Sequence, residues 1–114
     1  MLRPIPLKDL DKIELVPQAI IKKPVSYFQD TLGIKFVELH DDLDVYDGAA
    51  LSLNGKLPIA LKHYRGHPPD TTTIYLSREL RNNGEISRIV QRIIKELKLA
   101  PDAVSWQRSD SPEL

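Results

Sequence analysis

Apolar and polar residues alternate along the chain from residue 37 to residue 53, where most odd-numbered positions are apolar and most even-numbered ones are polar. A period of two places one face of a strand on a core and the other in water, as antiparallel sheets allow. Asp41 and Asp47 interrupt the apolar series. We therefore expect a turn over residues 40–44 and a bulge at Asp47 and Gly48.

Asn54-Gly55 follows this stretch and predicts a hairpin. Both central residues of a type I′ turn need positive φ, which asparagine and glycine adopt most readily. Leu57, Ile59 and Leu61 then alternate along the returning strand, and residues 71–76 alternate again with many β-branched side chains. These segments predict an antiparallel meander.

A helix is predicted after the sheet, from Gly84 to Lys98, with Asn83 as its N-cap. Its apolar residues recur at the i, i+3, i+4, i+7 spacing of an amphipathic helix. Val104 and Trp106 share one face of a short last strand, which we expect at a sheet edge. The apolar helix positions are Ile86, Ile89, Val90, Ile93, Ile94 and Leu97.

Prolines at positions 4, 6, 17 and 24 divide the first 33 residues. Each lacks a backbone donor and disfavours helix at the residue before it, so no long helix crosses this stretch. A short helix is predicted from Pro24 to Leu32, with Gly33 as its left-handed cap. Before Pro17 only short helical pieces are expected.

Together these segments predict an α+β fold: a single-layer antiparallel β-meander of about four or five strands. One face is packed by the C-terminal amphipathic helix and by the short N-terminal helix. We expect a single domain over residues 1–108, which includes a proline-punctuated N-terminal arm at residues 1–17. Residues 109–114, SDSPEL, are polar, and we expect a disordered tail there.

Composition narrows the function classes. The 114 residues suffice for one core, and 16 basic against 16 acidic side chains argue against a general nucleic-acid binder. The absence of cysteine excludes disulfides, thiolate nucleophiles and zinc–thiolate sites. No signal-peptide core and no membrane-length apolar run occur, so we expect a cytoplasmic protein with no membrane segment.

The loop after the returning strand carries the first candidate site. Function is disproportionately carried by loops that a rigid scaffold positions. His63 continues the inward apolar series, which predicts a partly buried, hydrogen-bonded ring as the competing interpretation. The candidate binding residues are His63, Tyr64, Arg65, His67 and Asp70.

A metal site is the alternative interpretation of the same region, because two or three histidines with a carboxylate suit zinc or iron. Gly66 and Pro68-Pro69 exclude the helix on which two histidines four apart would share a metal. Five carboxylates lie within residues 38–47, here called the acidic run, but they lack the ligand spacing of a calcium loop. A solvated turn is therefore one interpretation of this run, and a metal site or an acidic surface for a partner is the other. The candidate ligands are His40, Asp41, Asp44, His63 and His67.

Arg88, Arg92 and Lys95 form a basic stripe on the predicted C-terminal helix. A solvated helix face explains such a stripe, and an acidic partner or a phosphate backbone is the functional alternative. No G-x-S-x-G motif and no phosphate-cradling glycine loop occur in the chain, so we do not favour an enzyme.

We therefore expect a small protein-binding or regulatory module that needs no cofactor. Its working surface would be the exposed sheet face with the loop from Arg65 to Thr71, and its partner another protein or a second copy in a homodimer. Arg65, His67 and Asp70 would be the first residues to substitute. The alternatives are a metal-assisted hydrolase or metal-binding protein, and nucleic-acid binding through the basic helix face.

Overall fold

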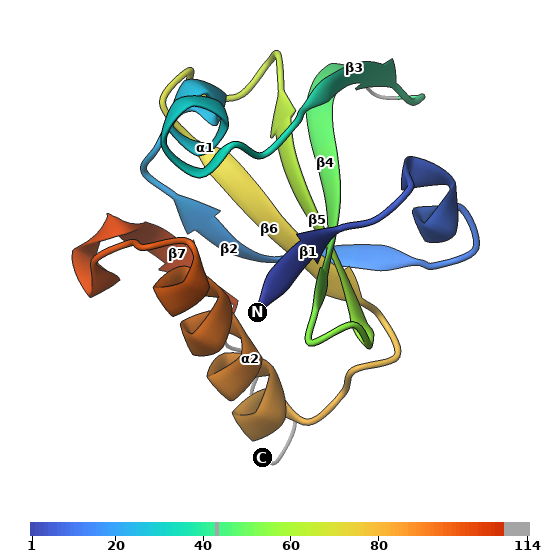
Figure 1. Ribbon diagram of the computed structural model, residues 1–114, viewed down its shortest axis with the longest axis vertical. Coiled ribbons are helices and arrows are strands. Elements are labelled where there is room, and N and C mark those ends of the chain that lie inside the picture. Colours follow the sequence, from blue (N-terminus) through green and yellow to red (C-terminus); the bar gives the residue numbers. More distant parts are fainter. Residues whose placement is uncertain (43, 109–114) are drawn as a thin grey trace.

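The computed structural model describes residues 1–42 and 44–108, which form one antiparallel sheet with two α-helices (Figure 1). The predicted disordered tail lies outside the described residues. The α+β class is confirmed. The elements are β1 (Leu2–Pro4), the 3₁₀ turn η1 (Leu7–Leu10), β2 (Leu15–Ile21), α1 (Val25–Leu32), β3 (Val37–His40), β4 (Val45–Leu53), β5 (Leu57–Tyr64), β6 (Thr72–Ser77), α2 (Asn83–Glu96), the 3₁₀ turn η2 (Pro101–Ala103) and β7 (Val104–Gln107).

Within the described residues the sheet has seven strands in the order β1-β4-β5-β6-β2-β7, and β3 also pairs with β4. Because β5 occupies one edge of β4, β1 and β3 lie end to end along the other edge. β1 is opposite residues 51–53 and β3 is opposite residues 45–48, so Ala49 and Ala50 fall between them. The expected four or five strands were too few, since the first 21 residues add β1 and β2 to the predicted strands.

The sequence pattern revealed neither β1 nor β2, and β2 lies between β6 and β7 inside the sheet. The prolines predict only that no long helix crosses this stretch. The register of β2 against β6 shifts between Pro17 and Ala19, and such a bulge accommodates a residue without an N–H. The predicted arm at residues 1–17 therefore supplies β1, η1 and the start of β2.

The predicted turns around β4 are confirmed. Asn54 and Gly55 have φ values of 56° and 72°, and the Lys56 N–H donates to the Leu53 carbonyl at 3.1 Å, as a type I′ turn requires. β3 ends at His40 and β4 begins at Val45, on either side of the predicted turn at residues 40–44, of which residue 43 lies outside the described residues. The expected bulge at Asp47 and Gly48 is wrong, because β4 keeps its register there with both β3 and β5.

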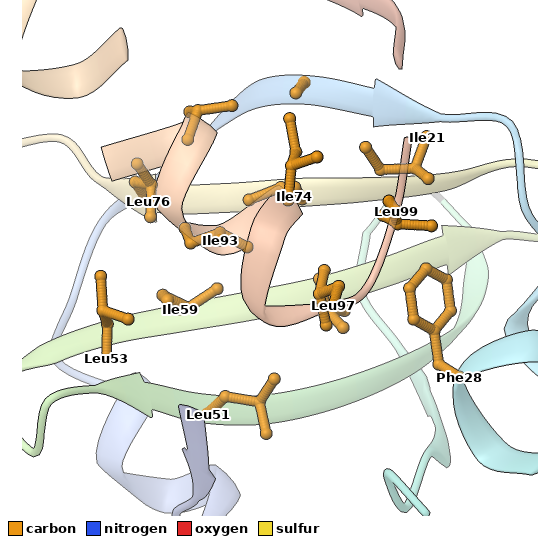
Figure 2. Packing of buried hydrophobic residues seen from close by; sticks show 14 of the residues in the cluster. Ile21, Phe28, Leu51, Leu53, Ile59, Ile74, Leu76, Ile93, Leu97 and Leu99 are labelled. Atoms are coloured by element: carbon orange, nitrogen blue, oxygen red, sulfur yellow. The ribbon is translucent and has the colours of Figure 1, made fainter. Parts of the chain in front are cut away.

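The helix α2 packs its apolar side on one face of the sheet, here called the inner face (Figure 2). Asn82, one residue before the predicted cap, accepts a hydrogen bond from the Glu85 N–H at 2.9 Å. Lys98 has a φ of 58°, a left-handed conformation that lies just after the end of the helix. Among the described residues, no helix has the length and apolar content to cross a membrane. The predicted apolar stripe is confirmed by the burial of Ile86, Val90, Ile93, Ile94 and Leu97.

Alternate residues of the central strands meet α2 in the core, and α1 closes one end of it with Phe28, which is fully buried. Gly33 has a φ of 68° and ends α1 as predicted. The last strand, β7, lies at the sheet edge, also as predicted. The inner-face core residues are Ala49, Leu51, Leu53, Ile59, Leu61, Ile74 and Leu76.

The other face of the sheet, here called the outer face, is partly covered by the segment between β1 and β2. Residues 5–14 connect β1, beside β4, to β2, beside β6, so they must cross the sheet. The turn η1 contacts β4 and lies across β4 and β5 from α2 (Figure 1). Ala50 and Ala60, on the outer face, are only 6% and 1% exposed, which fits this cover. The far half of the outer face carries the candidate site.

Candidate functional site

Three tyrosines and one lysine stand together on the outer face, and we call them the tyrosine patch: Tyr46, Lys62, Tyr64 and Tyr75. Tyr46 lies opposite Tyr64 across the β4–β5 ladder. Lys62 is two residues before Tyr64, and Tyr75 on β6 lies opposite Ala60. Strand alternation therefore puts all four on the face that bears Ala60, and all four are half-buried.

Gly48 makes room for the ring of Tyr46. A Cβ atom at Gly48 would lie 2.9 Å from Cε2 of Tyr46 and 3.4 Å from a methyl carbon of Leu39. The first distance is shorter than van der Waals contact allows. The missing side chain at Gly48 thus lets the Tyr46 ring lie over its own strand, next to Lys62.

Lys62 occupies the centre of the patch. Its Nζ lies 4.8 Å from the ring centroid of Tyr46 and 4.8 Å from that of Tyr75, so two cation–π contacts hold one ammonium group. Within residues 1–42 and 44–108 no carboxylate forms an ion pair with it. Burial lowers the pKa of Lys62, and the charge of Asp41 opposes that shift. Lys62 is a half-buried cation without a counter-ion in direct contact.

The tyrosine hydroxyls keep their protons. Burial raises the pKa of Tyr46, Tyr64 and Tyr75, and the negative charge of Asp41 raises each of them further. Tyr64 also donates a hydrogen bond to Asp41 Oδ2 at 2.6 Å, which stabilises its neutral form. At neutral pH the patch presents three neutral phenols and one cation.

Hydrogen bonds connect the acidic run (residues 38–47) to the loop that follows β5 (residues 65–71), although the two segments are far apart in sequence. Asp44 Oδ2 accepts a hydrogen bond from the Gly66 N–H at 2.8 Å, and Asp44 Oδ1 accepts one from the Val45 N–H at 2.7 Å. Asp41 Oδ1 accepts from the Asp44 N–H at 3.2 Å. These two carboxylates act as clamps that fix the loop against the patch.

The predicted binding residues are divided between the two sides of the sheet. Tyr64 is in the patch and the His67 ring packs on it at 5.6 Å. Arg65 instead pairs with Glu38 at 3.0 Å and Asp47 at 3.2 Å, residues that face each other across β3 and β4. The loop is therefore not one surface.

His63 and Asp70 take no part in the patch. His63 lies opposite Asp47 and continues the inner-face series as predicted, but its buried Nδ1 has no hydrogen-bond partner among the described residues. The expectation of a hydrogen-bonded ring is wrong for that nitrogen. Asp70 is exposed, and within the described ranges no hydrogen bond or ion pair involves it.

The candidate metal ligands are not gathered. The described residues contain no group of three or more histidine, aspartate or glutamate side chains placed to hold a metal ion. His40 is exposed at the end of β3, His63 lies within β5, and the His67 ring packs against Tyr64 in the loop after β5. The geometry of the described residues therefore lends the metal hypothesis no support.

The basic stripe lies on the exposed side of α2, where Arg88, Arg92 and Lys95 are all solvent-accessible. Arg92 Nε lies 3.2 Å from Glu96 Oε2, one helical turn away. An i, i+4 ion pair partly neutralises the stripe and is typical of a solvated helix face.

Sequence reasoning missed three of the four patch residues, Tyr46, Lys62 and Tyr75. Each stands at a position of the polar face, where an aromatic ring contributes nothing to the predicted core. The predicted hairpin could have identified part of the patch. Counting pairs outward from the Asn54-Gly55 turn places Tyr46 opposite Tyr64.

No protein-family model matches the chain, and comparison with curated proteins and with solved structures likewise found no match. The function is therefore inferred from the chain's own geometry. The tyrosine patch, in which Lys62 has no ion-pair partner among the described residues, is the feature that indicates a function.

Proposed function

We propose that this chain is a protein-binding module and that its tyrosine patch receives a carboxylate side chain of a partner protein at Lys62. One observation carries the proposal: a half-buried ammonium group lies between the rings of Tyr46 and Tyr75, and no carboxylate of the described residues forms an ion pair with it. A desolvated charge without a partner is destabilising unless something completes it.

The composition of the patch supports recognition of a protein. Tyrosine is enriched at the energetic centres of protein interfaces, because its ring supplies a large contact area with only two side-chain torsions to fix. The patch is also held in place before binding, because Asp41 accepts from Tyr64 and Asp44 accepts from Gly66. A prearranged surface loses less conformational entropy on association.

The charges around the patch favour an acidic partner group. Asp41 and Asp44 already accept hydrogen bonds from their own neighbourhood, whereas the ammonium of Lys62 contacts two aromatic rings and forms no ion pair with the described residues. A single cation is enough for one carboxylate. Nucleic-acid binding would need several cations along a phosphate backbone, and the patch contains a single cation, Lys62.

Site-specific photo-crosslinking tests the proposal. A photoreactive phenylalanine analogue replaces Tyr75 in one protein and Tyr27 in its matched control, since Tyr27 on α1 also carries a lysine, with Lys23 Nζ 5.0 Å from its ring centroid. We expect the Tyr75 position alone to crosslink a specific partner from the native cell extract. Capture is followed by titration calorimetry with the purified partner.

In that titration, Lys62→Glu should weaken binding at least about tenfold, because two like charges would meet in a desolvated site. Lys23→Glu should leave the affinity unchanged. Replacing the partner's contacting carboxylate residue by lysine should restore binding to the Lys62→Glu variant. Equal crosslinking from Tyr27, or equal affinities for the Lys62→Glu and Lys23→Glu variants, would refute the proposal.

A further inference from the structure

A groove lies at the interrupted edge of the sheet, where β1 and β3 meet β4 end to end. Its volume is about 660 Å³. Its floor includes Ala49, Leu51 and Leu97, and its walls come from residues 2–7 and residues 31–37. The volume falls within the range of about 300–1,000 Å³ that small-molecule sites occupy.

The groove follows from the way the chain enters and leaves the sheet. The β1 ladder on β4 ends at Pro4, the Ile5 N–H donates to the Ala50 carbonyl at 3.1 Å, and β3 begins pairing at Val37, opposite Gly48. Ala49, the inner-face residue between the two ladders, has only a methyl side chain. An apolar recess therefore remains beside the C-terminal end of α2.

The end of α2 is held in place beside this recess. The hydroxyl of Tyr27 donates to the carbonyls of Leu97 and Lys98, at 3.2 Å and 3.1 Å. Leu97 itself is 1% exposed, so the floor is part of the packed core. The site is thus formed by the fold and does not depend on a ligand to order it.

The charges that line the groove favour an anion. Lys35 and Lys98 line it, are exposed, and have no carboxylate partner in the part of the chain that the structure describes. Glu96 is the one acidic residue of the lining, and its Oε2 lies 3.2 Å from Arg92 Nε and 3.6 Å from the amino group of Met1. Its charge is therefore largely compensated.

From this combination we infer that the groove binds a small amphiphile with one apolar chain and a carboxylate head. The chain would replace water over the partly exposed apolar lining, which includes Leu2, Ile5 and Ile34, and the carboxylate would lie at Lys35 and Lys98. Apolar lining with a few charged groups at fixed positions is the usual composition of such sites. The inference uses no residue of the tyrosine patch and is independent of the function proposed for it.

Displacement of a fluorescent acyl carboxylate, dansylaminoundecanoic acid, tests the inference on the full chain. Dodecanoate should displace the probe saturably with one site per chain. Dodecanol, which has the same carbon chain and no charge, should bind about tenfold more weakly. A third titration uses vesicles of phosphatidylglycerol: binding to vesicles without binding of dodecanoate would assign the lysines to a lipid surface and overturn the inference.

Two sets of variants locate the site. Ile34→Trp fills the groove from its wall and should abolish displacement, whereas Leu39→Trp, also half-buried but outside the lining, should not. Lys35→Glu combined with Lys98→Glu should weaken dodecanoate binding about tenfold and leave dodecanol unaffected. Because these lysines are exposed, the double variant keeps the test valid if Ile34→Trp fails to fold.

Lys95→Glu is the charge control, since it lies on α2 outside the lining. Unchanged affinity in Ile34→Trp or in the double lysine variant, equal binding of dodecanol and dodecanoate, or no binding at all would each refute the inference.

Discussion

Adjacent residues of β5 serve the two faces of the sheet in different ways. Leu61 is fully buried on the inner face, where α2 covers it. Lys62, the next residue, stands half-buried on the outer face between two tyrosine rings. The inner face buries apolar surface, which stabilises the fold. The outer face partly buries a cation, which costs free energy and does not stabilise the fold. Stability therefore explains the residues of the inner face but not Lys62 on the outer face.

Substituting the two neighbours in turn should give the largest contrast. Leu61→Ala removes three buried carbon atoms from the core and should lower the free energy of unfolding by about 2–5 kcal/mol. Lys62→Met retains an unbranched chain between the rings and removes a desolvated charge, so the change should stay below about 1 kcal/mol. Chemical denaturation with far-UV circular dichroism measures both. A comparable loss in both variants would mean that Lys62 is as structural as Leu61.

The inner face is the part of the fold that the sequence predicts well. The apolar residues from Ile86 to Leu97 recur with the period of a helix, and those of the strands that they cover recur with a period of two. Both layers of the core can therefore be predicted from the sequence. β2 escaped prediction because the prolines of this stretch argue only against a helix, and the bulge that accommodates Pro17 in a strand depends on β6. Local pattern cannot report a pairing between residues so far apart in sequence.

The candidate site was predictable only in part for the same reason. Tyr64 and His67 were identified from the loop, but their neighbours Tyr46 and Tyr75 come from other strands and join them through register. Arg65 was chosen with them, yet its ion pairs with Glu38 and Asp47 lie on the other side. Which residues share a surface depends on pairing, and sequence proximity does not decide it.

Gly48→Ala should disturb the outer face while leaving the inner core intact. The new Cβ would lie 2.9 Å from the Tyr46 ring, so the ring must move away from the strand. We expect a loss of about 1–3 kcal/mol, the usual range for overpacking. Loss of ring-current shifts at the Lys62 side chain in NMR spectra reports the movement directly.

The control for this substitution is a double-mutant cycle with Tyr46→Leu, which removes the ring that the new methyl group meets. In that background Gly48→Ala should lose most of its effect. An undiminished loss of stability there would place the strain in the backbone of β4 and leave Tyr46 uninvolved.

The smallest expected effect separates the electrostatics of the outer face from its packing. Asp41→Asn removes the charge that, after burial, raises the pKa of Tyr46, Tyr64 and Tyr75. At neutral pH the variant should lose about 1 kcal/mol or less, because asparagine can still accept from Tyr64. Spectrophotometric titration at 295 nm should show tyrosine ionisation at lower pH than in the wild type. Asp42→Asn, next in sequence and not a source of these shifts, should titrate like the wild type.

The sign of the pH dependence makes this test specific. A tyrosine whose pKa is raised on folding contributes stability that is complete below pH 10.0, its ordinary pKa, and is lost as pH rises through the folded value. Lys62, with a lowered pKa, acts oppositely: its penalty is complete below the folded value and disappears as pH approaches 10.5. Without the charge at residue 41 the tyrosine contribution shrinks, so the variant's stability should fall less steeply above pH 10.0 than the wild type's. Parallel pH profiles for the two proteins would mean that burial alone keeps the phenols neutral, and that Asp41 serves the outer face only as a clamp.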